Sequence, residues 1–288
     1  MKGYKSENIR NIALVGHGGC GKTTFLEAAL LATGVISRLG KVEDGNTVSD
    51  HDKMEIEKGY SISTSIVPVE YKNVKINFID TPGFFDFVGE VNSALRAVEA
   101  AAIVVDASAG IQVGTEKAWN SCKEFGVPKF FLINKTDKEN VDVDKTIDEL
   151  KSKFGTSVVT LDDKDALTEA IAETDEELME KFFSGEEFTD EEFNGGLSKG
   201  IGAGDIVPVL NCSSITGDGV EDVLGKFIDL VPKAKDHEDY DAKNDADEDI
   251  KVKVDPAGKP AAFVFKTIAD PFLGKISLAK VISGTLKA

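Results

Sequence analysis

Hydrophobic and polar positions follow two different periods along the chain, and the change of period predicts which segments are strands and which are helices. Short apolar runs rich in β-branched residues indicate buried strands, whereas apolar residues three or four positions apart indicate amphipathic helices. On this basis we expect strands at residues 9–15, 66–71, 74–80, 101–107, 129–134 and 206–211. Helices are expected near residues 22–32, 86–99, 113–125, 143–154 and 220–230, with an acidic helical region before the last strand.

This order of elements predicts an α/β fold. Strands that alternate with helices form a mostly parallel sheet with helices on both faces. The strands at 66–71 and 74–80 are the exception, because only Lys72 and Asn73 separate them, and this spacing predicts an antiparallel hairpin. Sheets of this kind bind ligands beyond the carboxyl ends of their strands. The residues that follow each strand are therefore the candidate site.

The pattern changes after Pro232, which predicts a domain boundary. Residues 236–250 are polar and acid-rich without apolar periodicity, as in a linker. Two strands are expected beyond it, at 262–268 and 276–282, and two strands cannot close a core of their own. The expected organisation is as follows: a first domain at 1–235 with a reduced, acidic helical insertion at about 138–204, a linker at 236–250, and an incomplete second domain at 251–288.

Charge and cysteine content narrow the class of protein. The formal net charge is −18, but residues 162–192 alone hold 14 acids and two lysines, and residues 236–249 hold eight acids and one lysine. Such segments do not lie along a phosphate backbone, so direct DNA binding is not expected. The start of the chain lacks the apolar core of a signal peptide, and no apolar run approaches the roughly 20 residues of a membrane span. Cys20, Cys122 and Cys212 are far apart, as in a reducing compartment, so a cytoplasmic protein is expected.

A glycine-rich segment joins the first expected strand to the first expected helix. Gly16-His17-Gly18-Gly19-Cys20-Gly21-Lys22-Thr23 matches G-x-x-x-x-G-K-[ST], and Thr24 follows it. The glycines bring backbone N–H groups onto phosphate oxygens, Lys22 adds a positive charge, and the Thr23 hydroxyl can ligate Mg²⁺. Cys20 lies near a helix N-terminus, where the pKa of a thiol is expected to fall. The segment predicts a phosphate-binding loop.

Asp80-Thr81-Pro82-Gly83 ends a second strand. A carboxylate at this place beside a phosphate loop is expected to hold Mg²⁺ through a water molecule, and the Gly83 N–H is expected to meet a γ-phosphate. The same four residues also form ordinary turns. These four residues therefore indicate a metal and phosphate site only because they occur together with a phosphate-binding loop.

Asn134-Lys135-Thr136-Asp137 ends another strand and predicts recognition of a base. Guanine presents two adjacent donors, N1–H and N2–H₂, and the carboxylate of Asp137 can accept both. Adenine offers no such pair, so with ATP this carboxylate would be left unpaired, at a cost that discriminates strongly. Asn134 is expected to read the base as well, and Lys135 to stack along its plane. After the last strand, the backbone N–H groups of Ser213, Ser214 and Ile215 are expected to face guanine O6.

With these motifs in this order, the chain resembles GTPases, and in particular the elongation factor G branch of the translational GTPases. The matching segments are residues 16–24, 58–62, 80–91, 109–119, 134–137 and 208–220, and residues 271–286 resemble the opening of the β-barrel that forms that family's second domain. The resemblance implies a P-loop GTPase G domain followed by the first strands of a β-barrel. It also implies GTP or GDP and Mg²⁺ as cofactors, and the ribosome as partner.

Two departures from the family concern the cations. The family's first switch usually reads Arg-Gly-Ile-Thr-Ile, whereas this chain has Lys58-Gly59-Tyr60-Ser61-Ile62. Ser61 keeps a hydroxyl, so the resemblance still implies it as a ligand of Mg²⁺ with Thr23 and, through water, Asp80. Gly19 stands where the family usually carries an acid. This change removes the expectation of an additional monovalent-cation site.

A third departure concerns catalysis. Phe84 stands where the family normally has the histidine that orients the attacking water. Phenylalanine cannot hydrogen-bond a water, so no residue is identified as catalytic, and only Lys22 and Gly83 are expected to support the reaction. His17 is an alternative partner for the water, although packing is the simpler interpretation of its place in the loop.

Three functions stay open from the sequence. The first is a ribosome-dependent GTPase of the elongation factor G type that acts in translation elongation. The second is a GTP-binding conformational latch that hydrolyses GTP weakly because of Phe84. The third is an unrelated ATPase or kinase with a fortuitous Asn-Lys-x-Asp.

Overall fold

The computed structural model describes residues 3–50, 52–237, 239–270 and 272–287. The chain divides into two compact units, one at 10–232 and one that combines 1–9 with 233–288. Pro271, within the segment that resembles the family's second domain, lies outside the described residues.

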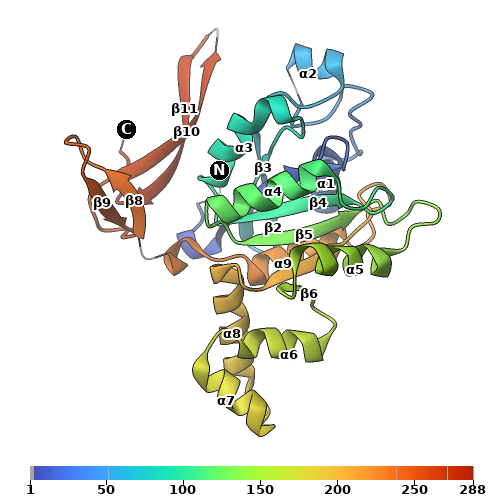
Figure 1. Ribbon diagram of the computed structural model, residues 1–288. Coiled ribbons are helices and arrows are strands. Elements are labelled where there is room, and N and C mark those ends of the chain that lie inside the picture. Colours follow the sequence, from blue (N-terminus) through green and yellow to red (C-terminus); the bar gives the residue numbers. More distant parts are fainter. Residues whose placement is uncertain (1–2, 51, 238, 271, 288) are drawn as a thin grey trace. The chain divides into compact units, whose positions relative to one another are not determined.

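The larger unit is built on one seven-stranded sheet with the order β2-β3-β1-β4-β5-β7-β6 (Figure 1). The pairs β1–β4, β4–β5, β5–β7 and β6–β7 are parallel, and β2–β3 is antiparallel. The strands are β1 (Ile9–Gly16), β2 (Ser65–Tyr71), β3 (Val74–Asp80), β4 (Ala100–Asp106), β5 (Lys129–Asn134), β6 (Val158–Thr160) and β7 (Val207–Asn211). The predicted hairpin is confirmed: Lys72 and Asn73 have φ angles of 46° and 63°, the left-handed pair that a two-residue turn requires.

Helices cover both faces of this sheet. The helices of this unit are α1 (Lys22–Ala32), α2 (Lys53–Lys58), α3 (Val88–Leu95), α4 (Val113–Glu124), α5 (Val143–Phe154), α6 (Lys164–Ala172), α7 (Glu176–Ser184), α8 (Asp190–Ala203) and α9 (Val220–Leu230), with a 3-10 turn at Phe85–Phe87. Helices α2 and α7 project away from the sheet (Figure 1). Two neighbouring residues of β5 define the faces, because successive side chains point to opposite sides. Phe130 packs edge-on against Phe227 of α9, whereas Phe131 stacks on Trp119 of α4. Helix α1 contacts α9 and so lies on the first face, and Trp119 also contacts Phe154 of α5 on the second.

The segment between β5 and β7 consists of α5, the short strand β6 and the helices α6, α7 and α8. Acidic side chains begin its helices: Asp163 caps α6, Asp175 caps α7, and Thr189 forms a capping box with Glu192 at α8. Carboxylates at helix N-termini are stabilising, which gives part of this acidity a structural role. Strand β6 was not predicted, because three residues are too few to establish a period.

The smaller unit contains two antiparallel hairpins and two 3-10 turns, η1 (Ser6–Asn8) and η3 (Ala234–Asp236). The hairpins are β8 (Asp239–Lys243) with β9 (Asp249–Lys253), and β10 (Ala261–Asp270) with β11 (Gly274–Ser283). Strands β10 and β11 include the two predicted at 262–268 and 276–282.

The linker expected at 236–250 is wrong, since η3, β8 and the first residues of β9 fall within it. Lys251 bonds Asp239 at 3.1 Å and Asp241 at 2.7 Å across the hairpin, so cross-strand charge pairs accompany a short alternation of apolar and charged residues. The high content of acidic residues led to the prediction of a linker, although apolar and charged residues alternate in both strands. Residues 3–9 also group with this unit rather than with the first domain.

The predicted fold class is confirmed: a mostly parallel sheet with helices on both faces is followed by antiparallel strands of the kind that open a β-barrel. Among the described residues, no helix combines the length and apolar character that crossing a bilayer requires.

Candidate nucleotide-binding site

Four strands of the sheet end on residues of the candidate site. Three of these residues were predicted from motifs, and the structure adds Asp106. Gly16 ends β1, Asp80 ends β3, Asp106 ends β4 and Asn134 ends β5. A cleft of about 460 Å³ opens beside these ends, as expected for the carboxyl edge of a parallel sheet. The predicted residues that line it are Gly18, Gly19, Gly21, Lys22, Thr23, Thr24, Ser61, Gly83, Phe84, Asn134, Lys135, Ser214 and Ile215.

The phosphate-binding loop has a backbone that only glycine can follow at two positions. Gly16 has a φ of 138°, and a Cβ there would lie 2.5 Å from the carbonyl oxygen of Val104. Gly21 has a φ of 97°, and a Cβ there would lie 2.4 Å from Asn134 Nδ2. Between them, the N–H groups of Gly18 and Gly19 make no hydrogen bond to the described residues. The loop therefore offers unused donors at the start of α1, the arrangement that binds phosphate.

Lys22 lies within this loop. Its side chain is buried, and Nζ donates hydrogen bonds to the carbonyl oxygens of Gly16 at 3.2 Å and His17 at 3.0 Å. Gly83 approaches from the β3 side, so closely that a Cβ would lie 2.6 Å from Lys22 Nζ and 2.7 Å from the nitrogen of Gly18. A side chain at position 83 is therefore excluded, and its backbone can reach whatever the loop holds.

Hydroxyls and carboxylates from four segments meet beside Lys22. Thr23 Oγ1 donates to Asp80 Oδ2 at 2.8 Å and lies 3.5 Å from Ser61 Oγ. Ser61 Oγ donates in turn to Asp50 Oδ1 at 2.8 Å. Burial raises the pKa of Asp80 to about 6, although the charge of Lys22 and the hydrogen bond from Thr23 oppose the rise. The cluster joins the loop, β3 and the segment before β2.

This cluster fits Mg²⁺. Asp80 Oδ1 is buried without a hydrogen-bond partner among the described residues, so one carboxylate oxygen is left for a metal-bound water. The described residues contain no group of three or more His, Cys, Asp or Glu side chains that could hold a metal ion. Mg²⁺ needs no such cage, since it takes few protein ligands and completes its shell with water and phosphate oxygens. Asp50 was missed by the sequence reasoning, because no motif contains it.

Asp137 follows β5 and is exposed, and its carboxylate accepts a hydrogen bond from Ser213 Oγ at 2.6 Å. Asp137 is not among the residues that line the cleft, although Lys135 and Lys138 on either side of it are. Its carboxylate is thus accessible to a base edge. Thr136 connects it to Lys135, and its N–H lies 3.5 Å from the carbonyl oxygen of Cys212.

The structure shows a bracing role for Asn134 that the motif did not indicate. Its side chain is fully buried; Nδ2 donates to the carbonyl oxygens of Cys20 and Gly21, and Oδ1 accepts from Ser214 N at 3.1 Å and Oγ at 2.8 Å. Through these hydrogen bonds, Asn134 braces the phosphate-binding loop against β5 and β7.

The prediction for the segment after β7 is corrected. The N–H of Ser213 donates to the carbonyl oxygen of Asp218 at 2.9 Å, and that of Ser214 is used by Asn134. Of the three, only the N–H of Ile215 has no hydrogen bond to the described residues. Of the three predicted donors, the N–H of Ile215 is therefore the one available to a ligand.

Lys135 is positioned by a residue that the motifs did not include. Its Nζ donates to the carbonyl oxygen of Gly19 at 2.6 Å and pairs with Asp106 Oδ2 at 2.6 Å. Burial raises the pKa of Asp106, but hydrogen bonds from Lys135 and Ser108 outweigh it and lower that pKa to about 2. Asp80 was predicted because it is a carboxylate at the carboxyl end of a strand. Asp106 stands at the same place in β4 and could have been predicted for the same reason.

Phe84 packs on an aromatic neighbour at the mouth of the cleft. Its ring centroid lies 4.5 Å from that of Tyr60, and the ring is 45% exposed. His17 does not line the cleft: its ring faces Gly114 and lies 6.1 Å from that of Phe85. Of the two interpretations of His17, packing is the one that the structure supports.

Eight other predicted residues do not line the cleft, namely Gly16, Cys20, Asp80, Thr81, Pro82, Thr136, Asp137 and Ser213. Cys20 is buried, and burial raises the pKa of its thiol, so the expected decrease is wrong. Thr81 is fully buried and donates to the carbonyl oxygen of Leu14 at 2.6 Å, which ties the turn after β3 to β1. Pro82 lines a separate small cavity of about 120 Å³ with Phe84 and Phe85.

Comparisons with known proteins agree with this geometry. A family model described as the elongation factor Tu GTP binding domain matches residues 7–233. Elongation factor G of Neorickettsia sennetsu is 31% identical over 98% of this chain and 48% of its own length. An elongation factor G-like protein of Thermotoga maritima is 31% identical over 98% of this chain and 46% of its own length.

A crystal structure of a protein from Thermus thermophilus superposes with a TM-score of 0.83 at 29% identity, covering 98% of this chain and 46% of that one. The chain spans about half the length of the curated relatives that it matches. Since the family match runs from β1 through α9 and includes every strand that ends at the cleft, the chain belongs to the translational GTPase family.

Proposed function

We propose that the protein is a ribosome-dependent GTPase of the elongation factor G type that acts in translation elongation in the cytoplasm. The observation that carries this proposal is the meeting of Thr23, Ser61 and Asp80 beside Lys22, because two hydroxyls and a carboxylate from separate segments would there share a Mg²⁺ ion bound to the nucleotide phosphates. The elongation factor G relatives support the ribosome as partner.

Each end of the cleft has a distinct task in this proposal. The free N–H groups of the loop and the ammonium of Lys22 bind the phosphates, and Asp137 accepts both donors of guanine. Thr23 and Ser61 would hold Mg²⁺ directly, with Asp80 holding one of its waters. When bound, the ion neutralises charge on the phosphates.

The same contacts support a switch. Ser61 precedes β2 and Gly83 follows β3, and both touch the phosphate end of the cleft. A γ-phosphate would hold the two segments, and its loss would release them. Equal affinity for the ribosome with GTP and with GDP would exclude this switch.

A second function is favoured by Phe84. Its ring stacks against Tyr60 and carries no group that can orient a water. In this alternative, the protein is a latch that loads GTP, holds its active conformation and hydrolyses the nucleotide weakly.

Single-turnover GTP hydrolysis by the intact protein, with and without ribosomes, separates the two. A GTPase of this class is stimulated by its partner by up to roughly 10⁵-fold over an unassisted rate on the order of 10⁻⁴ s⁻¹, whereas a latch stays near the unassisted rate.

Phe84→His tests whether the missing histidine is the cause of weak GTP hydrolysis. We expect it to raise the hydrolysis rate by roughly 10²-fold or more, since a positioned hydrogen-bonding group contributes at least that much. Phe84→Leu, which removes the ring without adding a polar atom, is the control and stays at the parental rate. An unchanged rate in Phe84→His would overturn the explanation based on the missing histidine.

A further inference from the structure

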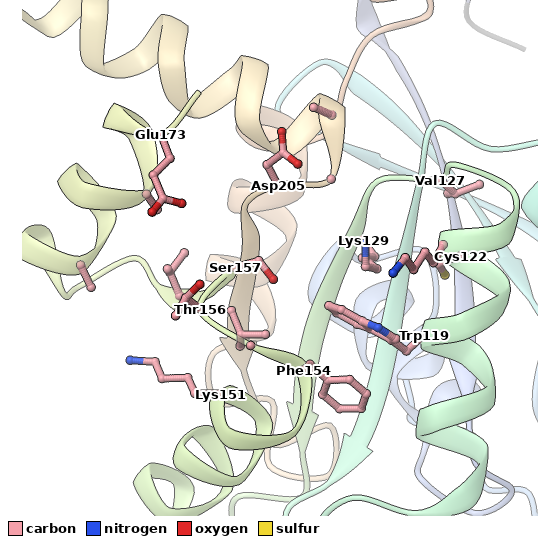
Figure 2. A pocket seen from close by; sticks show the side chains of 18 of the residues that line it. Trp119, Cys122, Val127, Lys129, Lys151, Phe154, Thr156, Ser157, Glu173 and Asp205 are labelled. Atoms are coloured by element: carbon pink, nitrogen blue, oxygen red, sulfur yellow. The ribbon is translucent and has the colours of Figure 1, made fainter. Parts of the chain in front are cut away.

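A second, larger cavity lies at the opposite edge of the same sheet. Its volume is about 880 Å³, and it opens where β5, β6 and β7 begin (Figure 2). Strand β5 runs from this cavity at Lys129 to the nucleotide cleft at Asn134. At about 3.3 Å per residue, the two sites are roughly 16 Å apart along the strand. The cavity is therefore separate from the nucleotide site.

Lys129 is the distinctive group of this cavity. The residue is only 6% exposed, and Nζ lies 4.5 Å from the centre of the Trp119 ring. Among the described residues, its ammonium forms no hydrogen bond and no ion pair. Burial lowers the pKa of Lys129, and burial raises the pKa of the neighbouring Cys122 to about 12, so that thiol stays neutral. The charge of Asp205 acts on this ammonium from beyond ion-pair distance. A buried ammonium that no carboxylate contacts can be stabilised by an anion that enters the cavity.

The other lining residues determine which kind of anion the cavity can hold. Trp119, Phe154 and Val127 supply apolar surface, and Thr156 and Ser157 bring hydroxyls. Figure 2 shows Lys129 and Trp119 on one side of the opening and Glu173 on the other. The charged residues of the lining are Lys123, Lys129, Lys151, Glu169, Glu173 and Asp205, so their formal charges cancel. A dianion such as phosphate would face three carboxylates, whereas a monoanion with an apolar body matches one free ammonium and an apolar wall.

We propose that this cavity binds a small monocarboxylate with an apolar body, whose carboxylate pairs with Lys129 and whose body lies along Trp119 and Phe154. The site does not depend on the bound nucleotide or on the function proposed above. The carboxylate would supply the ion pair that Lys129 lacks, in an environment where charge-assisted hydrogen bonds are strong.

The cavity contains its own reporter, because Trp119 is the only tryptophan of the chain. We would titrate the intact protein with hexanoate and follow tryptophan fluorescence, with calorimetry as a second readout. The comparison ligands are 1-hexanol, which has the same body without the charge, and inorganic phosphate. We expect hexanoate to bind saturably, and the other two to bind at least about tenfold more weakly.

Three variants locate the binding. Lys129→Met keeps the stem and should weaken hexanoate by about ten- to hundredfold. Lys123→Met removes an exposed charge from the same lining and should change affinity by less than about twofold. Ala166→Phe fills the cavity from α6, leaves Lys129 in place and should abolish binding. Binding of fluorescent GDP by each variant verifies that the fold is intact.

The proposal is overturned if hexanoate gives no saturable signal, or if Lys129→Met and Lys123→Met have the same effect. Phosphate that binds more tightly than hexanoate, or hexanol that binds equally well, would also exclude a monocarboxylate site. Since none of these results depends on GTP hydrolysis, failure here leaves the proposed GTPase function unaffected.

Discussion

Individual carboxylates at strand ends organise the nucleotide cleft. Asp106 ends β4 and holds Lys135 through an ion pair of 2.6 Å, while the same ammonium donates to the carbonyl oxygen of Gly19. Lys135 therefore links the base-recognition loop to the phosphate-binding loop. Asp106 does not line the cleft, whereas Lys135 does, so we infer that Asp106 acts by positioning Lys135.

Asp106→Asn tests this positioning. The substitution keeps the shape and removes the charge, so Lys135 loses its ion pair, and we expect fluorescent GDP to dissociate about tenfold faster. Asp162→Asn, at an exposed position before α6, changes the net charge equally and should leave the rate as it is. Equal dissociation rates for the two variants would show that Asp106 does not position the lysine.

Asp80 predicts a pH dependence of Mg²⁺ binding. Burial raises its pKa from 3.8 to about 6, so folding favours the protonated carboxyl, and that contribution to the free energy of unfolding is lost as the pH rises through about 6. Mg²⁺ requires the ionised form, so Mg²⁺ affinity of the GDP complex should fall as the pH drops below about 6, approaching tenfold per pH unit.

Titrations of Mg²⁺ into the complex with fluorescent GDP at several pH values measure this dependence. The nucleotide phosphates also titrate in this range, and Asp80→Asn isolates their contribution because it removes the carboxyl group. If the wild-type and Asp80→Asn slopes coincide, Asp80 does not compete with protons for the ion.

The sequence located these residues better than it assigned their roles. Asp80 and Asp137 could be placed because a motif gives both their type and their spacing to the loop. The hydrogen bonds from Asn134 to Cys20 and Gly21 form only once β1 and β5 have both paired with β4. The motif alone therefore could not reveal the bracing role of Asn134. Asp50 carries no motif, and only the fold brings it to Ser61.

At the scale of elements, helix α8 shows how closely packing depends on single atoms. Gly200 is buried, and a Cβ there would lie 2.6 Å from Ile206 Cδ1 and 2.8 Å from Thr174 Cγ2. Gly202, one half-turn further along the same helix, has nothing within 4 Å. Glycine at 200 thus lets α8 approach its neighbours, whereas glycine at 202 only weakens the helix.

Alanine substitutions at the two positions should therefore change the free energy of unfolding in opposite directions. Gly200→Ala should lower the free energy of unfolding by roughly 1–3 kcal/mol through overpacking. Gly202→Ala should raise it by up to about 1 kcal/mol through helix propensity. Urea denaturation of both variants measures the difference. Two stabilising substitutions would mean that α8 does not pack as closely as described.

Elements were predictable where a period extends over several turns or a full strand. The central strands and α9 met this condition, since their apolar positions face a core that includes Phe130 and Phe227. Strand β6 and the β8–β9 hairpin did not, because β6 pairs through only three residues and β8–β9 relies on charge pairs such as Lys251 with Asp241.

At the scale of the whole molecule, charge is unevenly distributed between segments. The acids of residues 162–192 lie on α6, α7 and the start of α8, while the phosphate-binding loop and Lys22 lie at the edge of the sheet where β1 ends. A polyanionic partner is therefore repelled by the acidic helices and is expected to approach through other surfaces. In the proposed binding mode, by contrast, the nucleotide phosphates meet free backbone donors and Lys22 at one end of the cleft.

Recognition of guanine by Asp137 is the central claim, and calorimetry of the intact protein with GDP and with ADP, both in excess Mg²⁺, tests it most directly. The exposed carboxylate can accept two hydrogen bonds from guanine and none from the same edge of adenine, so GDP should bind at least about 10³-fold more tightly. Asp137→Ala should remove most of this preference and leave ADP affinity unchanged. ADP bound as tightly as GDP by the wild-type protein would contradict the account.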